Sequence, residues 1–204
     1  MKALEAFATM CMMTLITVGV ANAQEASRPA WKVGDTWVYD MTYGAKNTYE
    51  VVAEQPDTYK VLVKRSNGSK SVLTYDRDGN LLARGNVSFT PKRDVLHFPL
   101  RVGESYTGVA YTHPHQRKPG VTVTTTAKIT SIKSEEVTVL AGTFIALRMD
   151  IEQSYKLSTG YSNSTKETGW YVPDVGRWVK YQTIDYGIPN QPEEMQLVSF
   201  KRGE

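Results

Sequence analysis

The chain has 204 residues, a length that suits one domain with a sizeable core and leaves little room for two. With 41% hydrophobic and 22% charged residues, its composition excludes a wholly disordered protein. The net charge of +3 is small and the Lys and Arg residues are scattered along the sequence, so we expect no nucleic-acid partner, which would require a concentrated basic face.

Residues 1–23 have the pattern of a secretory signal peptide. Lys2 precedes an uncharged apolar run from Ala6 to Val20, and Ala21-Asn22-Ala23 has the small-x-small form that signal peptidase accepts. The run is shorter than the roughly 17 residues that a membrane-spanning helix needs. We therefore predict cleavage near Ala23, no permanent membrane anchor, and a periplasmic or secreted mature protein.

The single cysteine, Cys11, lies inside this predicted signal peptide. The mature chain then has no thiol, which excludes disulfides, cysteine-based catalysis and thiolate metal sites. Its stability must come from its core alone.

Alternating polarity dominates the rest of the chain. Apolar residues recur at every second position in four segments, residues 37–43, 59–64, 121–130 and 144–151. Strands with one apolar and one polar face are typical of antiparallel sheets, and no segment after residue 23 has apolar residues at helical spacing. We predict an all-β protein, a curved antiparallel sheet that is half-barrel or barrel-like, forming a single domain over residues 24–204.

A short motif occurs twice in the chain. Trp31-Lys32-Val33-Gly34-Asp35-Thr36-Trp37 recurs as Leu100-Arg101-Val102-Gly103-Glu104-Ser105-Tyr106, and each copy introduces an alternating segment. This predicts a weak internal two-fold duplication, with halves at roughly 31–111 and 120–204. The stretch 112–120, rich in His, Pro and Gly, is predicted to be a loop that joins the halves.

Two segments together carry a family resemblance. One ends in Ala141-Gly142-Thr143-Phe144, and the other is Trp-Tyr-Val-Pro-Asp-Val-Gly-Arg-Trp-Val-Lys over residues 170–180. They resemble segments of exported bacterial β proteins of unknown function, relatives of the family catalogued as domain of unknown function 3108. The resemblance implies a curved antiparallel sheet in the bacterial envelope and supplies no catalytic residues.

Candidate reactive groups have simpler structural explanations. His113-Pro114-His115, with His97 elsewhere, is the one histidine cluster, and its composition favours a solvated loop over a copper or zinc site. Residues 76–80, Asp-Arg-Asp-Gly-Asn, have a hairpin pattern and not the spacing of an EF-hand calcium loop. We predict no catalytic residue, no metal and no cofactor.

Aromatic residues are abundant, with 12 Tyr and 4 Trp. Rings on the concave face of a curved sheet can hold an acyl chain or another apolar ligand, and they can equally fill the core. The ligand-binding candidates are Trp37, Tyr39, Tyr43, Tyr59, Trp170 and Trp178.

We therefore predict a non-enzymatic envelope module that binds an apolar small molecule or lipid, or an envelope protein, on the concave face of its sheet. One alternative is a hydrolase of envelope or extracellular polymers that acts through two carboxylates not identifiable from the sequence. Another is a structural module that offers a free edge strand to a partner.

Overall fold

A computed structural model describes residues 24–185 and 193–204. The predicted signal peptide and its cleavage near Ala23 therefore lie outside the described residues. Within them the chain is all-β, as predicted, with one short 3-10 turn, η1 (Thr42–Gly44), and no α-helix. No helix in this part of the chain is long and apolar enough to cross a membrane. The strands are β1 (Glu25–Ala26), β2 (Thr36–Met41), β3 (Ala45–Glu54), β4 (Thr58–Arg65), β5 (Lys70–Asp76), β6 (Leu81–Arg84), β7 (Val87–Arg93), β8 (Leu100–Arg101), β9 (Tyr106–Thr107), β10 (Tyr111–Pro114), β11 (Thr122–Val139), β12 (Gly142–Leu157), β13 (Ser162–Val172), β14 (Arg177–Asp185) and β15 (Glu193–Lys201).

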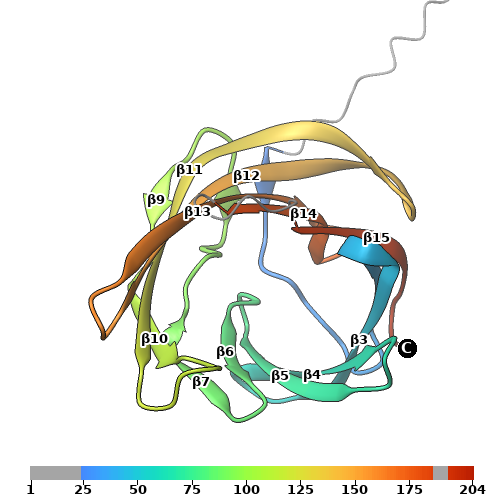
Figure 1. The fold of residues 1–204 in the computed structure, drawn as a ribbon. Helices are drawn as coiled ribbons and strands as arrows, with labels where there is room; N and C mark the ends of the chain where they lie inside the picture. Colours follow the sequence, from blue (N-terminus) through green and yellow to red (C-terminus); the bar gives the residue numbers. More distant parts are fainter. Residues whose placement is uncertain (1–23, 186–192) are drawn as a thin grey trace, which may run out of the picture.

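The sheet closes on itself. Its strands follow the order β10-β7-β6-β5-β4-β3-β2-β15-β14-β13-β12-β11, every neighbouring pair is antiparallel, and β10 also pairs with β11. The result is a closed barrel of 12 strands, which Figure 1 shows as a ring of arrows. Closure gives the sheet an enclosed inner face. It also joins the edge strands β10 and β11, which a partner adding a strand would otherwise use.

The closing strand corrects one sequence-based prediction. Residues 112–114 belong to β10 and not to a loop: Thr112 pairs with Thr90 on one side, and His113 pairs with Val123 on the other. The loop begins only at His115. The composition of this stretch is typical of loops, but pairing with a strand on each side holds its backbone extended.

The duplicated motif leads to different surroundings in its two copies. Gly34 and Gly103 both have positive φ, 92° and 88°, so each copy makes a similar bend that suits glycine. Beyond the bend, β2 pairs along its length with β3 and β15, whereas β9 adds two residues to β11. The internal duplication stays a prediction.

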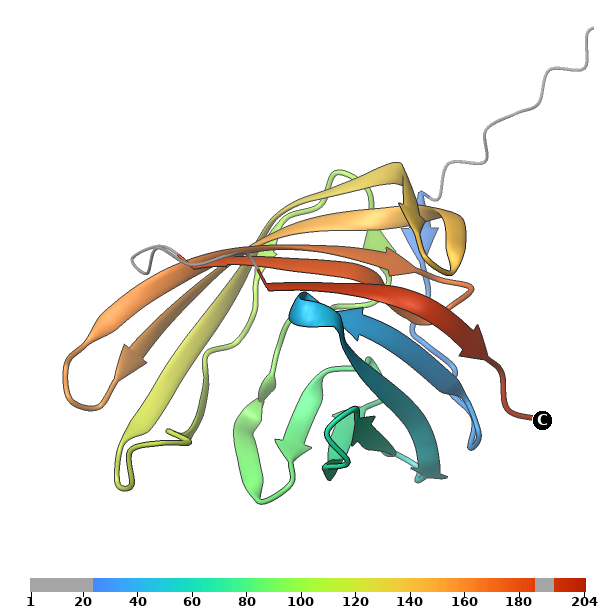
Figure 2. The same ribbon diagram turned by 45° about the vertical axis from the view of Figure 1, so that its right-hand side comes forward.

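Because the strands alternate in direction, their connections gather at two ends of the barrel. One end, the plugged end, holds the N-terminal segment 27–35, the long segment 94–110 and the C-terminus. At the other, the open end, lie the hairpin connections 42–44, 66–69, 85–86, 115–121 and 158–161. Figure 2 shows hairpins of the open end at the lower left and the C-terminus at the right.

The long segment 94–110, which we call the plug, is held against the barrel wall by one buried asparagine. Asn80, in the β5–β6 turn, accepts hydrogen bonds from the backbone N–H groups of Val95 and Leu96 at 2.9 and 2.8 Å. Its amide donates to Leu96 O at 2.8 Å. Each polar atom of this buried side chain is thus satisfied, as burial requires. The segment 94–110 is thereby tied to the barrel wall.

Two hydrogen-bonded carboxylates, buried Asp94 and half-buried Asp150, predict how stability depends on pH. Burial alone raises the pKa of Asp94, but hydrogen bonds from Val109 N and His97 and the charge of Lys92 outweigh it and lower the pKa below its usual value. The pKa of Asp150 is lowered similarly, since bonds from Ser131 and Arg148 outweigh its burial. A carboxyl whose pKa is lower in the folded state than in the unfolded state stabilises the fold. This contribution to the free energy of unfolding is fully present above the unfolded-state pKa of about 3.9, and it is lost as the pH falls through the folded-state pKa.

We therefore expect the urea midpoint of unfolding to fall as the pH drops below about 4, because the two carboxylates then become protonated. The double variant Asp94→Asn/Asp150→Asn should be less stable at neutral pH and should lose part of this acid dependence. Asp57→Asn, at an exposed turn position, is the matched control and should behave as wild type. An unchanged pH profile in the double variant would contradict the assignment.

Candidate ligand-binding cavity

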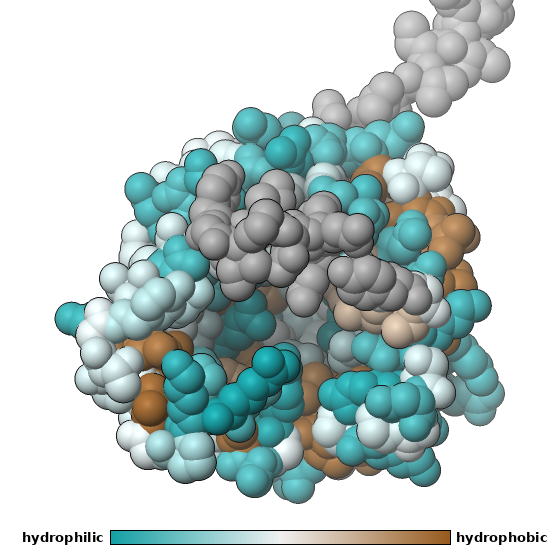
Figure 3. All heavy atoms as spheres, in the orientation of Figure 1, coloured by the Kyte–Doolittle hydropathy of each residue, from teal (hydrophilic) through white to brown (hydrophobic). Residues whose placement is uncertain are grey.

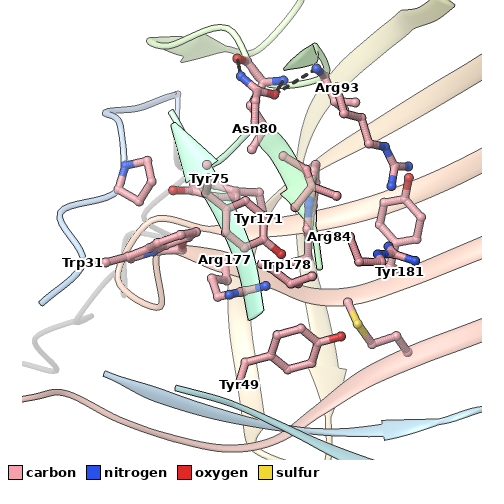
Figure 4. Close-up of a pocket in the computed structure, with 18 residues that line it drawn as sticks. Trp31, Tyr49, Tyr75, Asn80, Arg84, Arg93, Tyr171, Arg177, Trp178 and Tyr181 are labelled. Carbon is pink, nitrogen blue, oxygen red and sulfur yellow. Dashed lines mark hydrogen bonds between the residues drawn. The ribbon is translucent and has the colours of Figure 1, made fainter. Parts of the chain in front are cut away.

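The barrel encloses a cavity of about 220 Å³ on the inner side of the plug. Aromatic rings form much of its wall, and Figure 4 shows them converging from opposite walls of the barrel. Three arginines line it and no Asp or Glu does. The aromatic and charged lining residues are Trp31, Tyr49, Tyr75, Tyr171, Trp178, Tyr181, Arg84, Arg93 and Arg177. In the space-filling view of Figure 3, hydrophilic side chains surround a hollow between the barrel walls.

Three aromatic donors clamp the β13–β14 turn that forms one side of the cavity. Trp31 Nε1 donates to Gly176 O at 2.9 Å, and Trp37 Nε1 donates to Val175 O at 3.1 Å. Tyr39 OH donates to Trp178 O at 2.8 Å. Gly176 has φ +70°, and a Cβ there would lie 3.2 Å from Trp31 Nε1, so glycine suits both the turn and the close approach. The clamp fixes where Arg177 begins β14.

The guanidinium of Arg177 lies in a cage of aromatic rings. Its Cζ is 4.9 Å from the ring centres of Trp37 and Tyr49, 5.1 Å from Trp31 and 5.5 Å from Tyr75. Such contacts contribute about 0.5–2 kcal/mol each, more when desolvated. Arg177 Nη1 is buried and has no hydrogen-bond partner. Within the described residues no carboxylate forms an ion pair with this side chain, and its polar neighbours include the neutral phenols of Tyr75 and Tyr39.

The phenols beside Arg177 cannot balance that charge as anions. Burial raises the pKa of Tyr39, Tyr49 and Tyr171 above the usual value of about 10, although the positive charge of Arg177 opposes the rise in each. These tyrosines are therefore neutral near pH 7. Tyr171 adds a second unusual group, because its buried hydroxyl also has no hydrogen-bond partner.

The second interior arginine, Arg93, has a partner. Its Nη2 lies 3.9 Å from Glu167 Oε2, which also accepts hydrogen bonds from Gln153 and Tyr181. Tyr111 OH is 3.4 Å from Gln153 Oε1 and extends the network to the closing strand. This network crosses the barrel interior and neutralises Arg93, in contrast to Arg177.

Trp178 lies against a glycine. A Cβ on Gly169 would come within 2.6 Å of the Trp178 ring and 3.0 Å of Tyr181, so only glycine leaves room for this packing. Trp178 meets Tyr171 and Tyr181 edge-on, with ring centres 5.8 and 5.6 Å apart. Position 169 thus sets how far the indole reaches into the cavity.

The sequence-based candidates divide between cavity and core. Of the six, Trp178 lines the cavity. Trp37, Tyr39 and Tyr59 are 0–2% exposed and belong to the hydrophobic core. These three rings fill the core, which was the alternative to ligand binding. They support the cavity from behind and do not line it.

Trp170 is 8% exposed and belongs to the same core cluster without lining the cavity. Its indole N–H donates to Glu135 Oε1 at 2.6 Å, and its ring is near the cationic groups of Arg148 and Lys180. It therefore lies at the boundary between the core and charged side chains. The side chain of Tyr43 lies outside the described residues.

The sequence analysis missed Arg177, Arg93, Tyr171 and Tyr181. A strict period of two places residues 178 and 181 on opposite faces of a strand. A β-bulge shifts the register of β14 against β13 between Trp170 and Tyr171, and so both side chains reach the cavity. The unusual Gly176-Arg177-Trp178 sequence was the available signal, since it places a cation between turn and aromatic residues.

The histidines do not form a metal site. His97 Nε2 lies 2.9 Å from Asp94 Oδ2, and its ring stacks on Tyr106. His113 packs against Phe89 on the neighbouring strand. Across residues 24–185 and 193–204 no group of three or more His, Cys, Asp or Glu side chains is arranged to hold a metal ion.

The solved structures that resemble this chain include the following three. A protein from Bacteroides fragilis described as exported, with a YmcC-like fold, aligns over 87% of this chain and 100% of its own, with a TM-score of 0.53 and 14% identity. A protein from Parabacteroides distasonis described as a lipoprotein covers 87% of this chain and 100% of its own at 13% identity, with a TM-score of 0.47. The hypothetical lipoprotein YmcC of Escherichia coli covers 81% of this chain and 83% of its own at 15% identity, also with a TM-score of 0.47.

At such identity the likeness establishes the fold alone: this chain has a YmcC-like fold. No family model and no curated protein sequence matches it. The resemblance to relatives of the domain of unknown function 3108 stays a prediction.

The clamp yields a stability prediction. Trp31→Ala removes a ring that is 4% exposed together with its bond to Gly176, and should cost about 3–5 kcal/mol in urea unfolding. Trp31→Phe keeps a ring but leaves Gly176 O without its donor, and should cost about 1–3 kcal/mol. Exposed Tyr161→Ala is the control and should cost less than about 0.5 kcal/mol. Equal costs at positions 31 and 161 would show that the clamp is unimportant.

Proposed function

We propose that this protein is exported and binds a small ligand with an apolar body inside its barrel, without catalysing a reaction. The signal-peptide pattern of residues 1–23 supports export, and the structural neighbour from Bacteroides fragilis is described as an exported protein. The cavity walled by aromatic rings is the observation that carries the binding function.

The size of the cavity favours a small ligand. Its volume of about 220 Å³ exceeds the roughly 150 Å³ of an engineered cavity that binds benzene, and is below the roughly 300–1,000 Å³ typical of drug-sized ligands. Each buried CH₂ group contributes about 0.8 kcal/mol, so a short acyl chain or an aromatic ring gains enough to bind.

The alternatives have less support. A glycosidase-type hydrolase needs two carboxylates facing one another across a cleft, and no Asp or Glu lines the cavity. A protein partner that adds a strand needs a long free edge, and β10 and β9 already pair with β11 at residues 122–125 and 128–129. A small molecule is therefore the favoured partner over an envelope protein.

Filling the cavity tests the proposal. We expect octanol to bind wild-type protein in isothermal titration calorimetry. Met195→Trp places an indole from β15 into the cavity and should weaken this binding at least about tenfold, that is by about 1.4 kcal/mol. Gln196→Trp adds the same ring on the opposite face of β15 and should bind as wild type.

Urea midpoints establish that both variants are folded. Overpacking at position 195 should itself cost about 1–3 kcal/mol of stability. Octanol binding that persists in folded Met195→Trp, or no binding by the wild type, would rule out the cavity as the ligand site.

A further inference from the structure

We infer that the ligand is an anion, a small amphiphile whose carboxylate or phosphate group contacts Arg177 while its apolar body lies among the rings. This inference rests on the proposed function and specifies its ligand class. Two independent observations support it: the unbalanced charge of Arg177 in the cavity, and the charges around the open end of the barrel.

Three other partly exposed arginines show what is missing at position 177. Arg93 faces Glu167, Arg148 faces Asp150 at 3.0 Å, and Arg202 faces buried Asp35 at 3.2 Å. Each of these three side chains has an acidic partner. Arg177 lies in the barrel interior, and its ion-pair partner is absent among the described residues.

Arg177 is partly buried, and its buried Nη1 has no hydrogen-bond partner; leaving such a group without an anion is costly, because rings compensate for only part of its lost hydration. The nearby tyrosines are neutral, and no acid lines the cavity. An anion in the cavity would supply the missing charge. The planar guanidinium fork suits carboxylate and phosphate oxygens in particular.

The cavity has a cationic opening. Arg84, at the end of β6, is exposed to solvent and also lines the cavity, so it marks a point where the cavity meets the outside. A ligand that enters there meets Arg84 first and Arg177 farther in, and no lining carboxylate opposes it. Figure 4 shows Arg84 and Arg177 on the same cavity.

The five described connections at the open end carry charge of one sign. Taken with one flanking residue on each side, they contain no Asp or Glu. They contain five cationic side chains, Arg65, Lys70, Arg84, Arg117 and Lys118. The sixth connection, 186–192, lies outside the described residues, and Asp185 and Glu193 flank it in the sequence. The plugged end, by contrast, mixes both signs, with Asp57, Asp94 and Arg101 among them.

A hollow of about 620 Å³ lies at this basic end, between the β10–β11 and β12–β13 hairpins. His115, Arg117 and Lys118 contribute its cationic or titratable groups, and Tyr155 and Tyr161 contribute aromatic surface. No carboxylate lines it. A basic end with an acid-free hollow raises the local concentration of anions and speeds their association at low salt.

Four probes with the same alkyl chain test the inference: octanoate, octyl phosphate, neutral octanol and cationic octylamine. Titration of each into the full-length mature protein at pH 7 should show octanoate or octyl phosphate binding at least about tenfold tighter than octanol, as expected for a charge-assisted hydrogen bond. The tighter of the two anions identifies the head group as a carboxylate or a phosphate. Octylamine should bind weakest.

Substitutions locate the effect. Arg177→Met should abolish the preference for the anion, measured as the ratio of the octanoate and octanol dissociation constants within the same variant. Arg84→Gln, at an exposed position, should weaken anion binding without affecting the fold and supplies the test if Arg177→Met does not fold. Lys128→Gln removes one exposed charge on the outside of β11 and is the matched control.

The outcomes separate the two proposals. If octanol binds and is lost in Met195→Trp while neither anion binds tighter than octanol, the anion inference fails and the proposed function stands. Octylamine binding as tightly as the anions, or an anion preference that survives in both Arg177→Met and Arg84→Gln, would also overturn it. If none of the four probes binds, both proposals fail.

Discussion

The interior of this protein exists because a four-residue strand joins the two edges of its sheet. β10 pairs with β7 on one side and with β11 on the other, and this contact turns an open, curved sheet into a closed wall. Side chains that would face water on an open sheet are thereby enclosed. The aromatic core, the Glu167 network and the cavity all depend on that closure.

The plugged end then decides what the enclosed space can hold. Trp31, Trp37 and Tyr39 donate hydrogen bonds to backbone carbonyls at the β13–β14 turn and the start of β14, and the rings of Trp31 and Trp37 also contact the adjacent Arg177. The three residues thus fix the position of a cation, and two of them pack against it. Because no acid is included in that arrangement, the structure holds a charge whose balance must come from elsewhere.

Much of the fold could be predicted, because alternation along a strand is a local property. The period of two in residues 121–130 and 144–151 corresponds to β11 and β12, and the Asp-Gly-Asn pattern at 78–80 is a hairpin turn. Closure could not be predicted, since it rests on pairing between distant segments through a strand of loop-like composition. The site was largely missed for a related reason. The bulge in β14 breaks the alternation from which the inward-facing residues were inferred, and nothing in the local sequence shows that Arg93 and Arg177 line a cavity.

The pairing of β2 with β15 has a consequence for how the chain acquires its structure. Thr36 lies opposite Lys201, so the first long strand completes its hydrogen bonds only with the last. Contacts between residues so far apart in sequence form late and slow the folding of β proteins. A chain emerging from a ribosome or a translocation pore can therefore form hairpins early, but it cannot seal its wall until β15 has been released.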